Sequence, residues 1–346
     1  MPTRKATSCA NSNLAFVKYW GKRDSTLNIP TNGSISMNLS EARTTTTVEF
    51  DQGLSADEIF RQDKNSLADL AFAARTSRQL DRVRALAGVK TRAHITTNNE
   101  FPAGVGIASS ASGMAALTAA AAAALGLHLS ERDLSAMARL GSGSACRSIP
   151  AGFVEWMAGD SHETSYAVQI APPDHWQILD IAVVVSDKTK ALSSSDGHLL
   201  AVASPFFKAR LESMPGRLER VRNAILQRNF EAFGHEIETE AISLHAIAMT
   251  SPHEAGNSWL SGIYYWTPET MELILAVQRW RRDGLQVYFT LDAGPTVHLI
   301  CAATIRTQVE HAIDELEKSK PRPGSWRRLV NAPAQGTTVT ETILSS

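Results

Sequence analysis

Four separate segments of the sequence carry residues suited to binding phosphate and moving protons. The first, "NNEFPAGVGIASSASG" (98–113), places Gly106, Ser109 and Ser110 directly before an alanine-rich helical run. Unpaired N–H groups and the dipole at the start of a helix attract anions, so we expect this loop to bind phosphate. It lacks the Gly-Lys-Ser/Thr ending of a Walker A loop, and Ser109 stands where a dinucleotide-binding fingerprint requires its third glycine.

Two further segments add an arginine and an aspartate. "GSGSACRS" (141–148) is a second glycine/serine loop and ends with Arg147 close behind its serines. Arginine pairs with planar anions through two parallel hydrogen bonds, which lysine cannot do. "TLDAGPTVHL" (290–299) places Asp292 at the end of a predicted strand beside a Gly-Pro turn. A carboxylate in that position is a candidate for acid/base chemistry.

The fourth segment, "FVKYWGKRDSTLNIPTNGSISMNL" (16–39), groups Lys18 and Lys22 with Tyr19 around a glycine. Taken singly, each of the four segments also fits an ordinary structural role: a capped helix, a helix end, an Asx-type turn and a hairpin with solvated lysines. Together they supply two phosphate-binding loops, a cluster of positive charge and one carboxylate. That combination indicates phosphate binding coupled to acid/base chemistry.

The composition narrows the class of protein. The chain has 346 residues, more than a single hydrophobic core usually serves, so we expect two domains. Lys plus Arg number 34 against 35 Asp plus Glu, a net charge of −1 that gives no general attraction for nucleic acid. The three cysteines are far apart and suit neither a disulfide framework nor zinc, which favours free thiols in a reducing compartment. With no secretory or membrane-spanning segment visible, we expect a cytoplasmic protein without nucleic-acid or membrane partners.

Hydrophobic periodicity predicts a mixture of strands and helices that must position the four segments. The boundary between the domains is expected near residue 186, dividing the chain into 1–185 and 186–346. No flexible linker separates the halves, so we expect them to pack together with a cleft between them. The tail after Lys318 is expected to be loosely structured. Strands are expected at 34–39, 42–50, 92–98, 152–156, around 176–186 and in 285–302, and helices at 66–88, after 109, at 131–141 and from 204 onward.

The same segments, in the same order, resemble the mevalonate diphosphate decarboxylases of the GHMP kinase superfamily. The resemblance is carried by "KYWGKRD", "PTNGSIS", "NNEFP", "ASSASG", "GSGSACRS", "GFVEW", "VVSDKTK" and "DAGP", and spans the chain from residue 10 to about 300. It implies an α+β fold of two GHMP domains with the active site in the cleft. It further implies that ATP and Mg²⁺ serve to phosphorylate the 3-hydroxyl of a 5-phosphorylated mevalonate, after which phosphate and CO₂ leave. A homodimer is expected from the family.

The resemblance also implies roles for individual residues. Asp292 would accept or orient the proton of the tertiary hydroxyl, Arg147 would bind the substrate carboxylate or the transferring phosphate, and Lys18 would hold the reacting end. The tail of the substrate would be bound by Tyr19, Lys22, Ser142, Gly143 and Ser144. The nucleotide would be bound by Asn98, Gly106, Ser109, Ser110 and Lys188, with Ser110 also a candidate magnesium ligand.

Several departures from the family pattern leave open whether the substrate carries a 5-phosphate or a 5-diphosphate. Gly33 stands where a serine is common, and Pro150 and Ala151 replace an aromatic-glycine pair. A sibling group decarboxylates mevalonate 5-phosphate, and these changes are compatible with it. The retained Lys22 and the complete "GSGSACRS" set favour the 5-diphosphate, giving isopentenyl diphosphate rather than isopentenyl phosphate. A small-molecule kinase that stops at the 3-phosphate, and a non-enzymatic binding module, are the remaining alternatives; the intact Asp292 argues against the module.

Overall fold

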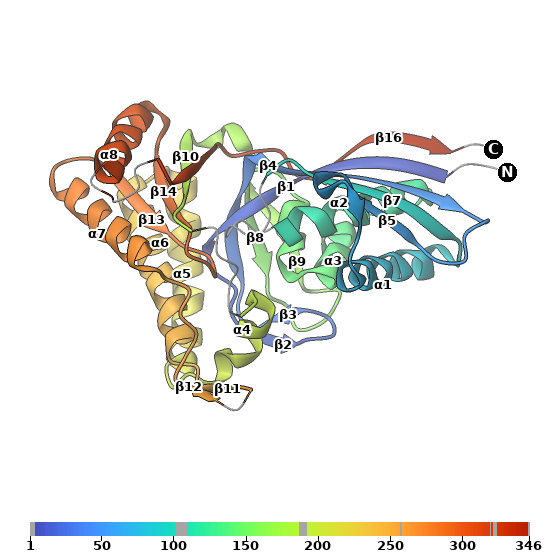
Figure 1. Cartoon of the computed structure of the whole chain (residues 1–346), viewed down its shortest axis with the longest axis horizontal. Helices are drawn as coiled ribbons and strands as arrows, with labels where there is room; N and C mark the ends of the chain where they lie inside the picture. The colour runs from blue at the N-terminus through green and yellow to red at the C-terminus, as the bar shows by residue number, and fades with distance from the viewer. Residues whose placement is uncertain are drawn as a thin grey trace.

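The protein is described by a computed structural model covering residues 4–101, 109–186, 192–256, 258–318, 320 and 324–344. A larger sheet with three helices forms one end of the molecule, and a smaller sheet with four long helices forms the other (Figure 1). This is the mixed α+β architecture expected from the sequence, with neighbouring strands mostly antiparallel. No helix among the described residues is long and apolar enough to cross a membrane.

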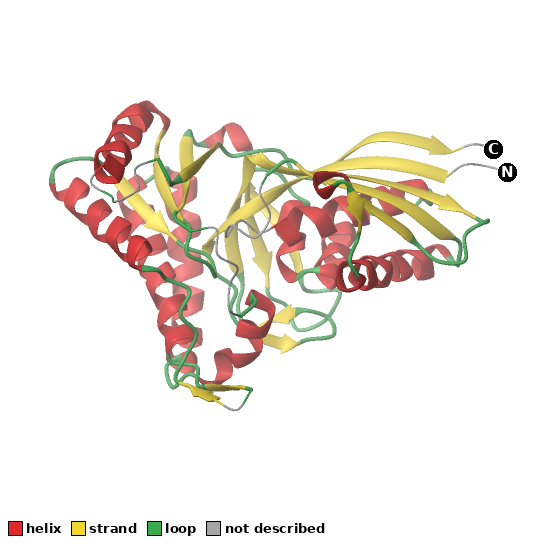
Figure 2. Cartoon of the chain, viewed as in Figure 1, coloured by secondary structure: helices red, strands yellow, loops and turns green. Residues whose placement is uncertain are grey.

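The larger sheet has eight strands and carries most of the predicted phosphate-binding residues. Its main path runs β16-β1-β4-β7-β5-β6, with β8 pairing with β4 and β9. Helices α1, α2 and α3 lie on one side of these strands (Figure 2). The strands and helices are β1 (Arg4–Val17), β4 (Ser34–Asp51), β5 (Glu58–Arg61), β6 (Ser66–Leu67), β7 (Arg92–Asn99), β8 (Phe153–Met157), β9 (Tyr166–Ala171), β16 (Thr338–Leu344), α1 (Leu70–Ala87), α2 (Ser109–Ala124) and α3 (Glu131–Gly141).

Helix α2 is buried along almost its whole length because its alanines allow close packing. It lies between the sheet and helices α1 and α3, in a core that includes Val48, Leu80 and Met114. Polar contacts tie it to the strands: Ser112 Oγ lies 2.7 Å from Thr44 Oγ1. The predicted helix ends flanking it are confirmed, since α1 ends at a left-handed Gly88 and Ser130 caps α3.

The second half of the chain forms a four-stranded sheet, ordered β13-β14-β10-β15, with long helices packed on it. Two small hairpins, β2–β3 and β11–β12, lie outside both sheets. The elements are β10 (Ile178–Val184), β13 (Val287–Thr290), β14 (Val297–Ala302), β15 (Arg327–Asn331), α4 (Ser194–Leu200), α5 (Phe207–Gln227), α6 (Phe230–Met249), α7 (Pro268–Arg282), α8 (Arg306–Lys318), β2 (Lys22–Asp24), β3 (Ile29–Pro30), β11 (His253–Ala255), β12 (Ser258–Leu260) and the 3₁₀ helices η1 (Gln62–Lys64), η2 (Gly143–Ser148), η3 (Pro173–His175), η4 (Ala201–Ala203) and η5 (Ala303–Ile305).

The two halves share a hydrophobic core, as the lack of a linker predicted. Phe16 on β1 meets Phe233 on α6 edge-on, with ring centroids 4.8 Å apart. The same cluster includes Met37 from β4 and Ile300 from β14. The ends of strands from both sheets are thus held against each other, which places the residues that follow β1 and β13 close together.

The end of the chain differs from the expectation. The predicted loose tail after Lys318 is wrong, because β15 pairs with β10 and β16 pairs with β1 at the edge of the larger sheet. The last strand therefore returns to the first half of the molecule, where Leu344 pairs with Arg4 and β16 lies beside β1 (Figure 1). The two strand signals at 34–39 and 42–50 also join into the single long strand β4.

Candidate active site

Lys18 and Asp292 form an ion pair where the two halves meet. Lys18 directly follows β1, and Asp292 lies two residues beyond β13 in a turn closed by the N–H of Gly294 donating to the Asp292 carbonyl at 2.7 Å. Lys18 Nζ donates to Asp292 Oδ1 at 2.7 Å and also to the carbonyl of Ala15. The lysine side chain is 2% exposed and the aspartate 24%, so the carboxylate remains accessible to a ligand while the ammonium is enclosed.

The electrostatics of the pair favour an ionised carboxylate. Burial by itself would raise the pKa of Asp292, but Lys18, His298 and Arg147 together hold it below its ordinary value. The pKa of Lys18 is lowered by burial, which the negative charge of Asp292 partly offsets. Asp292 is consequently a proton acceptor near neutral pH rather than a donor.

Arg147 is the second buried cation of the site. It lies on η2, is 3% exposed, and its guanidinium carbon sits 5.9 Å from the centroid of the Trp156 ring. Its Nε donates to Asn13 Oδ1 at 3.1 Å and its Nη1 donates to Ser34 Oγ at 2.7 Å. Burial lowers the pKa of Arg147, and Asp292 acts in the opposite sense. Since an arginine stays protonated in proteins, these contacts hold a positively charged fork in a fixed orientation.

A row of serine hydroxyls connects the two glycine/serine loops. Ser109 and Ser110 begin α2, where the first N–H groups lack helical partners. Ser110 Oγ lies 3.3 Å from Ser142 Oγ, which in turn lies 3.4 Å from Ser144 Oγ. The two segments predicted to bind phosphate are therefore brought together in one polar surface.

Tyr19 is held firmly against the second loop. Its ring stacks on His198 at 4.0 Å and meets Trp156 edge-on at 4.9 Å. A Cβ on Gly143 would come 2.8 Å from the Tyr19 hydroxyl, so position 143 has no room for a side chain. Burial raises the pKa of Tyr19, which keeps its phenol protonated and able to donate a hydrogen bond.

Lys22 lies near Tyr19 on the β2–β3 hairpin. Its Nζ donates to Asn28 Oδ1 at 2.8 Å, and partial burial lowers its pKa. His198, a residue the sequence reasoning missed, joins this group from α4 by accepting the N–H of Gly21 on Nδ1 at 3.1 Å. Burial, with Lys22 and Arg147 nearby, lowers the pKa of His198 well below its ordinary value, so the ring is neutral.

A pocket of about 160 Å³ opens beside the start of α2. Its polar lining includes Ser109 and Ser110 together with Arg61 and Arg75. Because side chains alternate along a strand, β7 presents Asn99 to this pocket, whereas Asn98 is not part of its lining. The complete lining is Thr46, Arg61, Asp63, Phe72, Arg75, Thr76, Ile95, Thr97, Asn99, Ser109, Ser110, Gly113, Met114 and Leu117.

Two of the predicted nucleotide-binding residues, Gly106 and Lys188, lie outside the described residues. Within the described part of the chain no three His, Cys, Asp or Glu side chains cluster as a metal site. Besides His198, sequence reasoning missed Asn13 and Ser34, which orient Arg147. Asn13 lies in a strand sequence without a recognisable signal, whereas Ser34 belongs to the quoted segment "PTNGSIS" but was given no role.

Comparisons with known proteins match this arrangement over nearly the whole chain. Residues 10–167 match the model described as "Diphosphomevalonate decarboxylase-like N-terminal domain", and residues 181–342 match "Mevalonate 5-diphosphate decarboxylase C-terminal domain". The diphosphomevalonate decarboxylase of Ganoderma lucidum is 35% identical over 341 residues, covering 92% of this chain and 82% of the relative.

Solved structures agree with the sequence matches. The crystal structure of mevalonate diphosphate decarboxylase from Staphylococcus aureus superposes with a TM-score of 0.89 at 33% identity, covering 98% of each chain. The structure of MDDEF in complex with MVAPP, AMPPCP and magnesium gives a TM-score of 0.88 at 31% identity, covering 98% of this chain and all of the other. Because family models match both halves and a relative is 35% identical over 92% of the chain, the chain belongs to the mevalonate diphosphate decarboxylase family.

Proposed function

We propose that this chain catalyses the ATP-dependent decarboxylation of mevalonate 5-diphosphate to isopentenyl diphosphate, with ADP, phosphate and CO₂ as the other products. The observation that carries the proposal is the Lys18–Asp292 pair at the junction of the halves, an ionised carboxylate that a ligand can reach beside the buried Arg147. The membership of the family and the ATP-analogue and magnesium ligands of MDDEF support it.

In this proposal Asp292 accepts the proton of the 3-hydroxyl as that oxygen attacks the γ-phosphorus of ATP. Lys18 keeps the carboxylate ionised and in place, and Arg147 binds the substrate carboxylate or the transferring phosphate. The 3-phosphate then departs with its bonding electrons. The bond between C2 and the carboxylate carbon breaks, its electron pair forms the alkene, and CO₂ is released. Fixed positive charge near the departing phosphate, where negative charge develops, lowers the barrier to this step.

The start of α2 would bind the nucleotide. Ser109 and Ser110 have hydroxyls and helix N–H groups available for phosphate oxygens, and the adjacent pocket would take the rest of the nucleotide. Gly106 and Lys188 keep their predicted nucleotide roles as part of this proposal, whereas Asn99 takes the place predicted for Asn98 because it lines the pocket. Magnesium suits such a site because it is usually held by substrate phosphates and few protein ligands. Ser110 is the candidate ligand, and the ion would neutralise phosphate charge.

Tyr19, Lys22 and the loop residues Ser142, Gly143 and Ser144 would bind the phosphorylated tail. The geometry at Gly33 bears on the length of that tail. A Cβ there would lie 3.0 Å from the Trp156 carbonyl oxygen and 3.1 Å from the Leu218 side chain, so glycine at this position is explained by packing. That explanation removes one argument for the 5-monophosphate.

One experiment separates the alternatives. Purified protein is given ATP, Mg²⁺ and either mevalonate 5-diphosphate or mevalonate 5-phosphate, while ADP and CO₂ are both measured. We expect equal amounts of ADP and CO₂ with the diphosphate. Faster CO₂ release with the monophosphate would assign the chain to the sibling activity, ADP without CO₂ would indicate a kinase, and ligand binding without turnover would indicate a binding module.

The location and assembly of the protein also remain part of the proposal. The described structure has free thiols at Cys9, Cys146 and Cys301, in keeping with a cytoplasmic enzyme. A homodimer is expected from the family, and light scattering of the purified protein would test it.

A further inference from the structure

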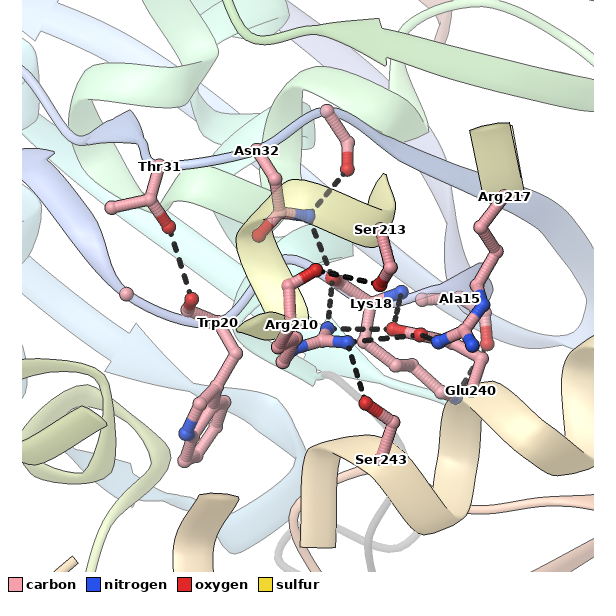
Figure 3. A network of polar contacts seen from close by, with 12 residues as sticks. Ala15, Lys18, Trp20, Thr31, Asn32, Arg210, Ser213, Arg217, Glu240 and Ser243 are labelled. Carbon is pink, nitrogen blue, oxygen red and sulfur yellow. Dashed lines mark hydrogen bonds and ion pairs between the residues drawn. The ribbon is translucent and has the colours of Figure 1, made fainter. Parts of the chain in front are cut away.

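A buried carboxylate contacts the backbone of Lys18 and lies outside the four segments identified from the sequence. Glu240 belongs to α6 in the second half of the chain and is fully buried. Its Oε1 accepts the backbone N–H of Lys18 at 3.0 Å. Arg210 on α5 donates to both oxygens of the same carboxylate, at 2.6 and 2.9 Å. Figure 3 shows these groups converging on the backbone of Lys18.

The carbonyl of Lys18 is held as well. Arg210 Nη2 donates to it at 3.0 Å, and Asn32 Nδ2 donates to it at 3.0 Å. Both backbone polar groups of one residue are therefore satisfied by side chains rather than by a neighbouring strand, which fixes the chain where β1 ends. Two of the three side chains come from helices of the other half, so this contact sets the position of Lys18 relative to the half that carries Asp292.

The charge of Glu240 also reaches the Lys18 ammonium. Burial lowers the pKa of Lys18, Asp292 and Glu240 raise it, and Arg147 lowers it further. Glu240 does not act alone, because Arg210 and Arg217 both donate to its carboxylate, and Arg217 Nε also faces Glu236 Oε2 at 3.5 Å. The two arginines reduce the negative charge that Lys18 experiences.

We propose that Glu240 is a positioning residue for the reaction: it holds the Lys18 backbone against Asp292 and supplies part of the negative charge that keeps the ammonium charged. The proposal rests on the role of Lys18 in the proposed function. A merely structural Glu240 would affect stability alone. A positioning Glu240 also affects the alkaline limb of the pH–rate profile, where loss of the Lys18 proton would end activity.

Three substitutions test this. Glu240→Gln keeps the size and one acceptor oxygen but removes the charge. The pKa of Lys18 should fall, moving the alkaline limb of kcat to lower pH by about one unit, with a fall in kcat at neutral pH of roughly tenfold. Arg217→Gln removes a charge that opposes Glu240 without touching the backbone of Lys18. It should move the same limb to higher pH.

Glu238→Gln is the matched control. Glu238 lies two residues earlier on α6, is 8% exposed, and binds both terminal nitrogens of Arg281 at 2.6 and 2.9 Å. It also accepts a backbone N–H, that of Phe289, at 3.1 Å. Its substitution removes an equivalent set of contacts that do not involve Lys18. It should lower the thermal midpoint without moving the alkaline limb.

Opposite shifts for Glu240→Gln and Arg217→Gln, with none for Glu238→Gln, would support the proposal. The proposal would be overturned if the alkaline limb of kcat were unchanged in both Glu240→Gln and Arg217→Gln, or if it shifted equally in all three variants. If Glu240→Gln fails to fold, the direction of the Arg217→Gln shift decides alone. Carbon-13 NMR of the Lys18 Cε, assigned with Lys18→Met, follows the same titration without turnover. It therefore tests the effect of Glu240 even if the wild-type protein releases no CO₂ and the proposed function fails.

Discussion

Replacing Asp292 by Asn tests the centre of the proposed mechanism. The amide keeps the size of the side chain and can still accept from Lys18 Nζ, but it cannot take a proton from the substrate hydroxyl. General acid/base assistance is typically a factor of about 10² to 10⁴. That factor corresponds to roughly 3 to 5 kcal/mol of barrier height. We therefore expect kcat to fall by at least a factor of about 100.

The structure predicts that this substitution lowers stability but leaves the ligand sites formed. Lys18 keeps its contact with the Ala15 carbonyl and the charge of Glu240, but its buried ammonium loses the counter-charge of Asp292, so the free energy of unfolding should fall by roughly 3 kcal/mol. ATP and mevalonate 5-diphosphate should bind within a few-fold of wild-type affinity. Coupled ADP release measures kcat, calorimetry measures binding and urea unfolding measures stability. If the variant kept more than about a tenth of wild-type kcat, Asp292 would be only a turn-forming residue.

The other substitutions address the two ligands separately. Ser110→Ala should lower kcat/KM for ATP at unchanged thermal stability, and unchanged kinetics would remove the start of α2 from the mechanism. Lys22→Met should raise the KM for the phosphorylated mevalonate far more than the KM for ATP; an equal rise in both would contradict its assignment to the tail. Gly143→Ala should raise the same substrate KM, since a Cβ would lie 2.8 Å from the Tyr19 hydroxyl, and an unaltered KM would show that Tyr19 does not bind the tail. Arg147→Lys should lower kcat by roughly 10²-fold, and a variant with near wild-type turnover would show that its paired geometry is dispensable.

Acid titration gives an independent check on Asp292. Its pKa in the folded protein lies below the ordinary value of 3.8, so the ionised group stabilises the fold at pH values above 3.8. That contribution is lost as pH falls through the lower, folded-state pKa. In the Asp292→Asn variant, the free energy of unfolding should therefore fall less steeply than in the wild type as the pH drops through this acid range. If the two curves were parallel, the Asp292 carboxylate would not be stabilised by Lys18.

Local signals in the sequence predicted much of this fold. The β-branched run of β7 and the caps at Gly88 and Ser130 depend on residues close in the sequence, so their structures follow from propensity and capping. Pairing of β16 with β1 joins the two ends of the chain, and nothing local specifies it. The charged cluster around Glu240 was likewise missed, because charged side chains on a helix normally face solvent and the partners of Glu240 come from two other segments, the end of β1 and helix α5.

The same non-local contacts explain how an ion pair can be assembled from residues 274 positions apart. Lys18 and Asp292 each follow a strand, β1 and β13, that belongs to a different sheet. The shared core, in which Phe16 packs against Phe233, brings the ends of these two strands together. The hydrogen bonds from Lys18 N–H to Glu240 and from Arg210 to the Lys18 carbonyl then fix the backbone of Lys18. A buried ammonium needs its counter-charge close by, since one left without a partner loses its proton or destabilises the fold. Lys18, in the first half, therefore keeps its positive charge only when the second half is folded and supplies Asp292. This dependence explains why the ion pair lies at the junction of the two halves.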